Sequence, residues 1–268
     1  MAKSPMRRSS TSPRPKSRPP KQTLNPSSLP TKLPRLKPHQ KPKPQSKSSK
    51  RPGKRLLSFD RRLGARFVAG ADEAGRGSLA GPLVVAGVLL DYAGLRDHRV
   101  RPLALLNDSK QLDPARREEL FCAILGCAER IAVRVISHER IDREGLHRSN
   151  LWGLRDVLHE LSPPAEVCVV DGFRLGPLAP RHTAVVDGDE RSAAIAAASV
   201  IAKVTRDRLM RRLDPLFPHY GFRSHVGYIT PSHSAVVRER GPCQIHRRSF
   251  QALCYLPQDE ALARIDAA

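Results

Sequence analysis

Beyond residue 65, short apolar runs alternate along the chain with segments whose apolar residues recur at helical spacing. Apolar runs at Arg66–Asp72 and Pro82–Leu90 flank a glycine-rich turn, and this pattern predicts an antiparallel hairpin. Three later runs predict further strands, at Ile131–Ser137, Val167–Asp171 and Thr183–Asp187. The first strand of the hairpin and the last two strands each end at or near a carboxylate.

Three segments carry the helical pattern. Asp113 precedes a proline and apolar residues at helical spacing, an arrangement typical of an N-cap followed by a helix. Asn150–Leu161 places leucines on one face and ends before two prolines, and Ser192–Leu213 opens with alanines that allow close approach to a sheet. Strands that alternate with helices predict an α/β domain with helices flanking a central sheet. The leading hairpin makes that sheet mixed.

The first 55 residues differ in composition from the rest of the chain. They contain 17 of the 47 Lys and Arg residues, 12 of the 24 prolines and no Asp or Glu, in a chain of net charge +21. Such a segment buries too little apolar surface to offset the entropy lost on ordering, so we expect a disordered basic tail over residues 1–55. Residues 56–268 suffice for one domain with its own core.

The remaining composition narrows the class of protein. Five cysteines show no metal-ligand spacing, which favours a reduced, cytoplasmic protein with thiols in its core. No stretch approaches the ~18–20 apolar residues of a membrane span, so we expect no membrane partner. We take a monomer as the default oligomeric state.

Four carboxylates share one context, because each lies at or just after the end of a predicted apolar strand. They are Asp72, Glu73, Asp171 and Asp189. Ligands of open α/β sheets gather at the carboxyl ends of strands, so side chains far apart in sequence can meet there. Neighbouring residues of a regular strand point to opposite faces, so Asp72 and Glu73 share a site only if the strand is already ending. A single strand-end aspartate is more often a turn or cap residue.

The segment Asp72–Gly77 favours a functional interpretation of these acids. Carboxylates that repel one another are neutralised by divalent cations, and two Mg²⁺ or Mn²⁺ ions roughly 4 Å apart serve phosphodiester hydrolysis. The Gly75-Arg76-Gly77 sequence can bring backbone N–H groups and a guanidinium close to a phosphate or a sugar. The segment therefore combines a metal-binding half with a half suited to nucleic acid.

Gly70–Pro82 closely resembles the first signature of the type 2 ribonucleases H, specifically ribonuclease HII. Further segments match that family's motifs in the same order along the chain, and the matches span nearly the whole predicted domain. They are Asn107–Leu112, Val170–Gly172, Gly188-Asp189 with Ile195–Asp207, Tyr220–Phe222 with Val226–Thr230 and His233, and Ile245–Phe250. The chain is thus similar to this family over six collinear motifs.

The resemblance implies a ribonuclease H-like fold and an endoribonuclease that hydrolyses the RNA strand of RNA–DNA hybrids. It also implies nicking on the 5′ side of ribonucleotides embedded in duplex DNA, which leaves a 3′-hydroxyl and a 5′-phosphate. The implied cofactors are two divalent ions, Mn²⁺ or Mg²⁺. RNA–DNA hybrids and ribonucleotide-containing duplex DNA are therefore the expected partners.

The resemblance assigns roles to eight residues. Gly75-Arg76-Gly77 would sense the ribose 2′-hydroxyl, the group by which a protein distinguishes RNA from DNA. Tyr228 would pack on the sugar of the following nucleotide. The catalytic residues, which would also bind the metal ions, are Asp72, Glu73, Asp171 and Asp189.

Three positions depart from the family's pattern. Ser78 replaces a common proline, and Asp187 and Val226 stand where lysines are common, so each of the latter removes a positive charge near the expected active face. Asp187 also rivals Asp189 as the fourth ligand, although the spacing to the alanine-rich helix favours Asp189. An aspartate at 189 and the lack of a folded N-terminal domain argue against the sister family, ribonuclease HIII.

One alternative function stays open, namely a non-catalytic nucleic-acid-binding protein that uses the basic tail. A chain segment with 17 positive charges attracts polyanions, so we expect tail-assisted DNA association that does not depend on base sequence. Lys110 and Lys203 are equally well interpreted as surface lysines, and His233 and His246 are expected to be hydrogen-bonded structural residues. The sequence does not decide which metal serves or whether a clamp protein is recruited.

Overall fold

The computed structural model describes residues 53–95, 103–106, 112–250 and 255. The predicted tail lies outside these residues, apart from its last three, which start helix α1 (Gly53–Arg61). Gly53 is buried, and its N–H donates to the carbonyl of Ala104, so residues 53–55 are helical where the prediction places them in the tail. The Asn107–Leu112 motif also lies outside the described residues, except for its last position.

Within the described residues, five strands form one sheet in the order β3-β2-β1-β4-β5. The strands are β1 (Phe67–Ala74), β2 (Leu83–Asp91), β3 (Arg130–Ile136), β4 (Val167–Asp171) and β5 (His182–Val185). β1 and β2 pair antiparallel from Phe67↔Asp91 to Ala74↔Val84, which confirms the predicted hairpin. β4 runs parallel to both β1 and β5, so the sheet is mixed, as predicted.

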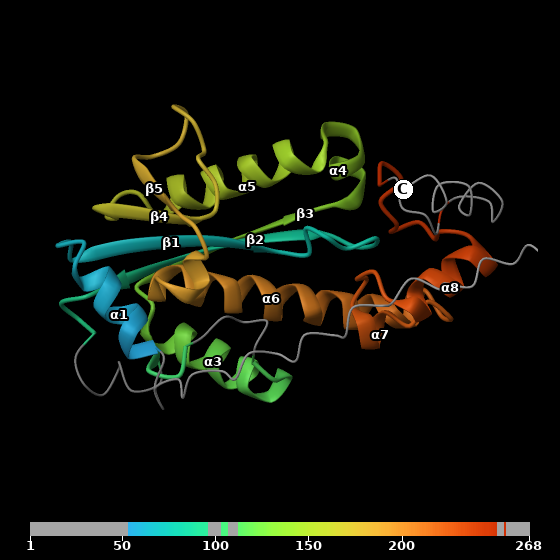
Figure 1. The fold of residues 1–268 in the computed structure, drawn as a ribbon, viewed down its shortest axis with the longest axis horizontal. Helices are drawn as coiled ribbons and strands as arrows, with labels where there is room; N and C mark the ends of the chain where they lie inside the picture. The colour runs from blue at the N-terminus through green and yellow to red at the C-terminus, as the bar shows by residue number, and fades with distance from the viewer. Residues whose placement is uncertain (1–52, 96–102, 107–111, 251–254, 256–268) are drawn as a thin grey trace, which may run out of the picture. The chain divides into compact units, whose positions relative to one another are not determined.

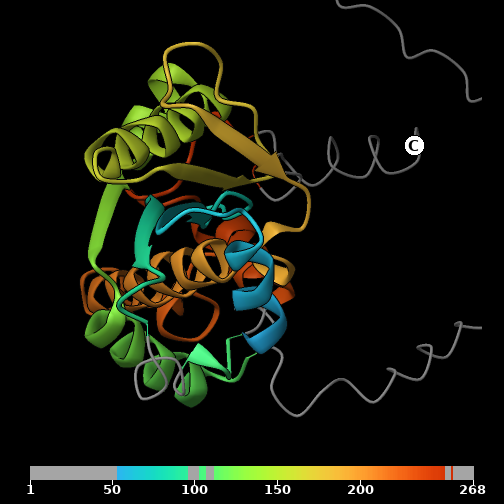
Figure 2. The same cartoon turned by 90° about the vertical axis from the view of Figure 1, so that its left-hand side faces the viewer.

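Helices cover both faces of this sheet (Figures 1 and 2). α4 (His138–Glu144) and α5 (Leu146–Leu161) lie on one face, and α1, α3 (Pro114–Cys127) and α6 (Ala193–Leu213) lie on the other. The short η1 turn (Gly188–Glu190) precedes α6. The elements η2 (Asp214–Leu216), α7 (Phe222–His225) and α8 (Pro231–Arg240) follow it. None of the described helices combines the length and the apolar character that a membrane crossing requires.

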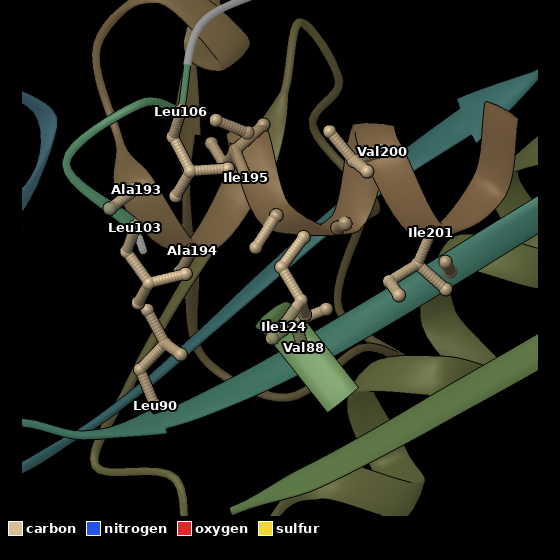
Figure 3. Close-up of a cluster of buried hydrophobic side chains, with 14 of the residues drawn as sticks. Val88, Leu90, Leu103, Leu106, Ile124, Ala193, Ala194, Ile195, Val200 and Ile201 are labelled. Atoms are coloured by element: carbon tan, nitrogen blue, oxygen red, sulfur yellow. The ribbon is translucent and has the colours of Figure 1, made fainter. Parts of the chain in front are cut away.

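α6 packs more closely against the sheet than an ordinary helix could. Its N-cap is Ser192, whose Oγ accepts a hydrogen bond from the Ile195 N–H, and every residue of Ala193–Ala202 is buried. Figure 3 shows the start of α6 packed with residues of β2, α3 and the 103–106 segment. At Gly70 of β1, a Cβ would lie 2.2 Å from the carbonyl carbon of Ala194, so only glycine permits this approach. The small residues thus set the distance between α6 and β1.

The structure moves several predicted boundaries. β1 continues to Ala74, two residues past the predicted end, because its pairing with β2 continues to Val84. β5 ends at Val185 and not at Asp187, because Asp187 takes a left-handed backbone conformation with φ 50° and leads into η1. α5 begins four residues earlier than predicted. α1, α4, α7 and α8 were not predicted, since each has ten residues or fewer and offers little periodic pattern.

Candidate active site

A cavity of ≈ 470 Å³ lies at the carboxyl ends of β1 and β4, beside the middle of α6. Its lining brings together residues from strands, helices and loops that are far apart in the sequence. They are Asp72, Glu73, Ala74, Gly75, Arg76, Gly77, Arg117, Asp171, Ser199, Lys203 and Tyr228. Seven of the eight residues to which the sequence resemblance assigns roles therefore share one cavity, and Asp189 is the exception.

Asp72 is buried on the face of the sheet that α6 covers. Ala71, the residue before it, packs on the opposite face with α5, and successive strand residues alternate. Burial raises the pKa of Asp72 well above its ordinary value, and the negative charges of Glu73 and Asp171 raise it further. Hydrogen bonds from Ser199 and from the Glu73 N–H, 2.7 Å from Oδ1, oppose this shift. The site thus contains carboxylate repulsion that a cation would relieve.

Asp72 and Glu73 share the cavity although β1 does not end between them. On one side, β1 keeps its antiparallel pairing with β2 through both residues. On the other side, the parallel pairing with β4 stops at Ala71↔Val170, so both acids lie beyond the last paired residue of that edge. The expectation that the strand ends at the acids is therefore wrong for the β2 side and holds for the β4 side.

Asp171 is the last residue of β4, and a backbone hydrogen bond fixes its carboxylate. The N–H of Gly188 donates to Asp171 Oδ1 at 2.7 Å, which ties η1 to the cavity. Asp189 is buried and directly follows Gly188, but it is not among the residues that line the cavity. Asp187, its predicted rival, is exposed and lines a second cavity beside α1. Both acids adjoin Gly188 in the sequence, and they differ in that Asp189 is buried whereas Asp187 is exposed.

The carboxylates of the cavity suit a hard divalent cation, because Asp72, Glu73 and Asp171 offer only oxygen donors. Within the part of the chain that the structure describes, no group of three or more His, Cys, Asp or Glu side chains could hold one ion. Mg²⁺ is compatible with such a site, since it commonly takes one or two carboxylates and completes its shell with water and phosphate. The raised pKa of Asp72 supports the same fit, because a bound cation stabilises the ionised carboxylate.

Gly75-Arg76-Gly77 forms the turn after β1, and Tyr228 lies beside it. Ser78 and Tyr228 form an isolated antiparallel bridge, which joins this turn to the segment between α7 and α8. The exposed Arg76 places its guanidinium 4.7 Å from the centre of the Phe173 ring. Lys203 Nζ lies 4.7 Å from the centre of the Tyr228 ring. The cavity therefore combines an acidic part with a basic and aromatic part, as recognition of a phosphate backbone and a sugar requires.

Arg206 of α6 is buried, and its hydrogen bonds hold the turn after β1 and the segment between α7 and α8 together. Its guanidinium donates to the carbonyl oxygens of Pro82, Val226 and Ala80 at 2.9, 2.9 and 3.0 Å. The Gly75 position accommodates this side chain, because a Cβ at Gly75 would lie 1.8 Å from Arg206 Nε. Arg206 thereby connects the turn after β1 with the backbone that leads to Tyr228.

Arg247 is a second buried arginine that binds backbone carbonyls. It donates to the carbonyl oxygens of Gly81 and Arg76, each at 3.0 Å, and its own N–H donates to the carbonyl of Leu79 at 2.8 Å. Burial and the neighbouring Arg206 charge lower the pKa of the Arg247 side chain. The backbone of the Gly-Arg-Gly turn is thus held from the inside of the protein, while the Arg76 side chain is exposed.

A buried pair of histidines holds the backbone of Tyr228. His233 Nδ1 lies 2.9 Å from the Tyr228 carbonyl oxygen, and His233 Nε2 lies 3.1 Å from His246 Nε2. The Cys243 N–H donates to His246 Nδ1 at 3.0 Å. His246 must therefore carry its proton on Nε2 and donate it to His233, which in turn donates from Nδ1 to Tyr228. The prediction that both histidines are hydrogen-bonded structural residues is confirmed.

Three polar lining residues are not singled out by the sequence resemblance as site residues. Ser199 had a usable signal, because it is the single polar residue within Ala193–Ala202. Lys203 forms an i,i+4 ion pair with Asp207 at 2.9 Å and its side chain is only 16% exposed, so it is not an ordinary surface lysine. Arg117 is one of two adjacent arginines on α3, and nothing in the local pattern distinguishes it.

Comparison with known proteins gives a consistent result. Residues 69–253 match the family model described as Ribonuclease HII. A ribonuclease HII from Rhizobium johnstonii is 46% identical over 203 residues, which cover 75% of this chain and 85% of the relative. Among solved structures, the ribonuclease H2 of Pyrococcus horikoshii OT3 is similar with a TM-score of 0.60 and 26% identity, over 75% of this chain and 100% of that chain. The structure of the PCNA:RNase HII complex from Archaeoglobus fulgidus gives a TM-score of 0.59 and 30% identity, over 69% and 96% of the two chains.

Proposed function

Since this chain belongs to the ribonuclease HII family and is a ribonuclease H of RNA–DNA hybrids, we propose that it also nicks duplex DNA on the 5′ side of an embedded ribonucleotide. We propose hydrolysis that depends on two divalent ions, Mg²⁺ or Mn²⁺. The observation that carries the proposal is the sharing of one cavity by Asp72, Glu73, Asp171 and the Gly75-Arg76-Gly77 turn. Acids for metal-dependent phosphodiester hydrolysis and a candidate 2′-hydroxyl sensor thus lie together.

The four predicted acids would hold the ions, with Asp189 reaching the cavity from its buried position in η1. When bound, such ions supply an activated water for attack at phosphorus and stabilise the charge on the leaving oxygen. Asp72 contributes a carboxylate whose pKa burial raises and which Ser199 orients by a hydrogen bond. The products would be a 3′-hydroxyl and a 5′-phosphate.

Discrimination for RNA is proposed to lie on the other part of the cavity. The turn Gly75-Arg76-Gly77 can offer N–H groups and a guanidinium to the ribose 2′-hydroxyl and the adjacent phosphate. Tyr228 would pack on the following sugar, with Lys203 next to its ring adding positive charge. The buried hydrogen bonds of Arg206, Arg247 and the histidine pair would keep this part of the site in one geometry before the substrate arrives.

A labelled DNA duplex that carries one internal ribonucleotide tests the proposal. We expect the full chain to nick it 5′ to the ribonucleotide with Mg²⁺ or Mn²⁺, and not with EDTA. Asp72→Asn should abolish nicking and retain duplex binding. Asp187→Asn is the matched control, because it makes the same chemical change at an acid that lines a different cavity, and it should retain nicking.

Two results would contradict the proposal. Unchanged nicking by Asp72→Asn would exclude the assigned metal site. An RNA–DNA hybrid that is cut while the single-ribonucleotide duplex stays intact would exclude the finer substrate assignment. Duplex binding without cleavage of either substrate would favour the alternative function, a nucleic-acid-binding protein that relies on its basic tail.

A further inference from the structure

We propose that a second cavity, beside α1, binds a backbone phosphate of the same duplex that the active site cuts. This proposal rests on the proposed function, because it assigns a further contact to the same substrate. The cavity has a volume of ≈ 340 Å³. It is lined by Arg55, Phe59, Arg62, Asp187, Glu190 and Arg191.

The lining has three arginines against two acids, and its arginines are exposed. Arg55, Arg62 and Arg191 are all exposed, and none of these three guanidinium groups forms an ion pair within the described residues. Arg191 lies 5.6 Å from the centre of the Phe59 ring, and Arg55 donates one hydrogen bond to the backbone carbonyl of Glu190 at 3.2 Å. The planar guanidinium presents a fork of donors that matches phosphate oxygens.

Further charges on α1 extend this cationic surface. Lys54 and Arg61 are exposed on the same helix. The exposed Asp187 and Glu190 oppose anion binding, but five cations outnumber them. The excess of positive charge favours a polyanion over a divalent cation or an acidic metal complex.

The η1 turn connects this second cavity to the active site. Asp187 and Glu190 line the second cavity, whereas Gly188 between them donates to Asp171 of the first. Along α6, Ser199 of the active site lies six residues after Ala193, which at 1.5 Å per residue is about 9 Å from the helix start beside η1. Successive phosphates of a duplex strand advance by about 3.4 Å along the axis, so a duplex held at the active site presents further phosphates to the neighbouring surface.

The sequence around α1 supports a nucleic-acid partner. α1 lies before residue 69, where the match to the family model begins, so its cations lie outside the matched region. The chain reaches α1 directly from residues 1–52, which contain many Lys and Arg residues and no Asp or Glu. A contact made only to phosphates adds affinity without base specificity.

The test measures duplex binding by fluorescence anisotropy as a function of salt, with the full chain in EDTA so that the duplex stays intact. Arg55→Ala combined with Arg62→Ala should weaken binding. It should also reduce the slope of log K against log salt by about 0.9, the contribution of one phosphate contact. Asp187→Asn removes a repulsive charge at a position whose left-handed backbone asparagine tolerates, so it should tighten binding.

Arg212→Ala combined with Arg238→Ala is the matched control, because both residues are exposed and the net charge falls by the same amount. Arg212 lies at the far end of α6, about 28 Å from Ala193 at 1.5 Å per residue. The proposal is overturned if the control pair weakens binding as much as the α1 pair, or if Asp187→Asn leaves the affinity unchanged.

The experiment separates this proposal from the proposed function. Nicking by the unmodified chain tests the function, whereas the difference between the two double variants tests the second cavity. Normal nicking with equal effects of both pairs would overturn the second cavity alone. No duplex binding by the unmodified chain would overturn both.

Discussion

The histidine pair that holds Tyr228 predicts how folding stability depends on pH. His233 and His246 are both fully buried, and burial lowers the pKa of each to about 4, from about 6.5 in an unfolded chain. Between these values the unfolded chain binds more protons than the folded one. The stability contribution of the pair is therefore complete above pH 6.5 and is lost as the pH falls toward 4.

The magnitude follows from the size of the pKa shifts. A lowering of the pKa from about 6.5 to about 4 corresponds to about 3 kcal/mol for one ring, at about 1.4 kcal/mol per unit. Only about 2 kcal/mol of this is lost between pH 7 and pH 5, because pH 5 is still above the pKa of about 4 in the folded protein. The 3.1 Å contact between the two Nε2 atoms needs one unprotonated nitrogen, so protonation of His233 also breaks the connection to His246. We expect the pair together to lose about 2 to 4 kcal/mol over this interval.

Urea unfolding at pH 7 and pH 5 measures this contribution in the unmodified chain and in His246→Asn. The asparagine keeps an acceptor for the Cys243 N–H, and the difference between the two pH values cancels any loss that does not depend on pH. Asp60 and Asp72, whose pKa values burial raises, act in the opposite direction but are present in both proteins. The variant should show a pH dependence smaller by about 2 kcal/mol. Equal pH dependence in the two proteins would refute the reasoning.

Three further predictions follow from the buried contacts of the site. Asp72→Asn should raise the midpoint of thermal unfolding in EDTA, because it removes a carboxylate whose ionised form is disfavoured; a lowered midpoint by differential scanning calorimetry would contradict this. Gly70→Ala should destabilise the protein by about 1–3 kcal/mol in urea and slow cleavage, because its Cβ would displace Ala194 and with it α6. The matched control is Gly126→Ala, where a Cβ meets no atom within 4 Å. Arg206→Lys should raise KM more than it lowers kcat, because the shorter range of one ammonium does not reproduce the guanidinium's bonds to three carbonyls. An unchanged KM in steady-state kinetics would argue against a role of Arg206 in positioning the substrate-binding backbone.

Local patterns in the sequence were sufficient to predict the framework of the fold. The strand at Val167–Asp171 has the predicted limits, and the hairpin and α6 agree to within two residues. These elements have buried apolar faces with clear period, so their pattern is strong. α1 and α4 lack such a pattern, because α1 has few turns and α4 has only seven residues, of which only Ile141 is buried.

The acids of the site were predictable from the sequence, and the buried arginines that hold its backbone were not. Asp72, Glu73 and Asp171 are recognisable because each occurs in a short, specific sequence context. Arg206 and Arg247 bind the carbonyls of Ala80 and Gly81, which are more than 120 residues away in the sequence, and no local spacing records such a contact. The sequence also could not show that the pairing of β1 with β4 stops at Ala71, one residue before the two acids, since this depends on the register of the parallel pair.

Asp187 and Val226 occupy the two positions where the resemblance to the family leads us to expect lysine. Asp187 and Val226 both have left-handed backbone, with φ 50° and 43°, and a β-branched residue is strained in that region. Val226 keeps the conformation because Arg206 binds its carbonyl and its side chain is buried beside Phe222. The backbone that leads to Tyr228 therefore holds its conformation with valine at this position. The active-site cavity has three cations beside its acids, Arg76, Arg117 and Lys203. The cations of α1 and the basic residues before it carry further positive charge, which is the reason to look for a second phosphate contact there.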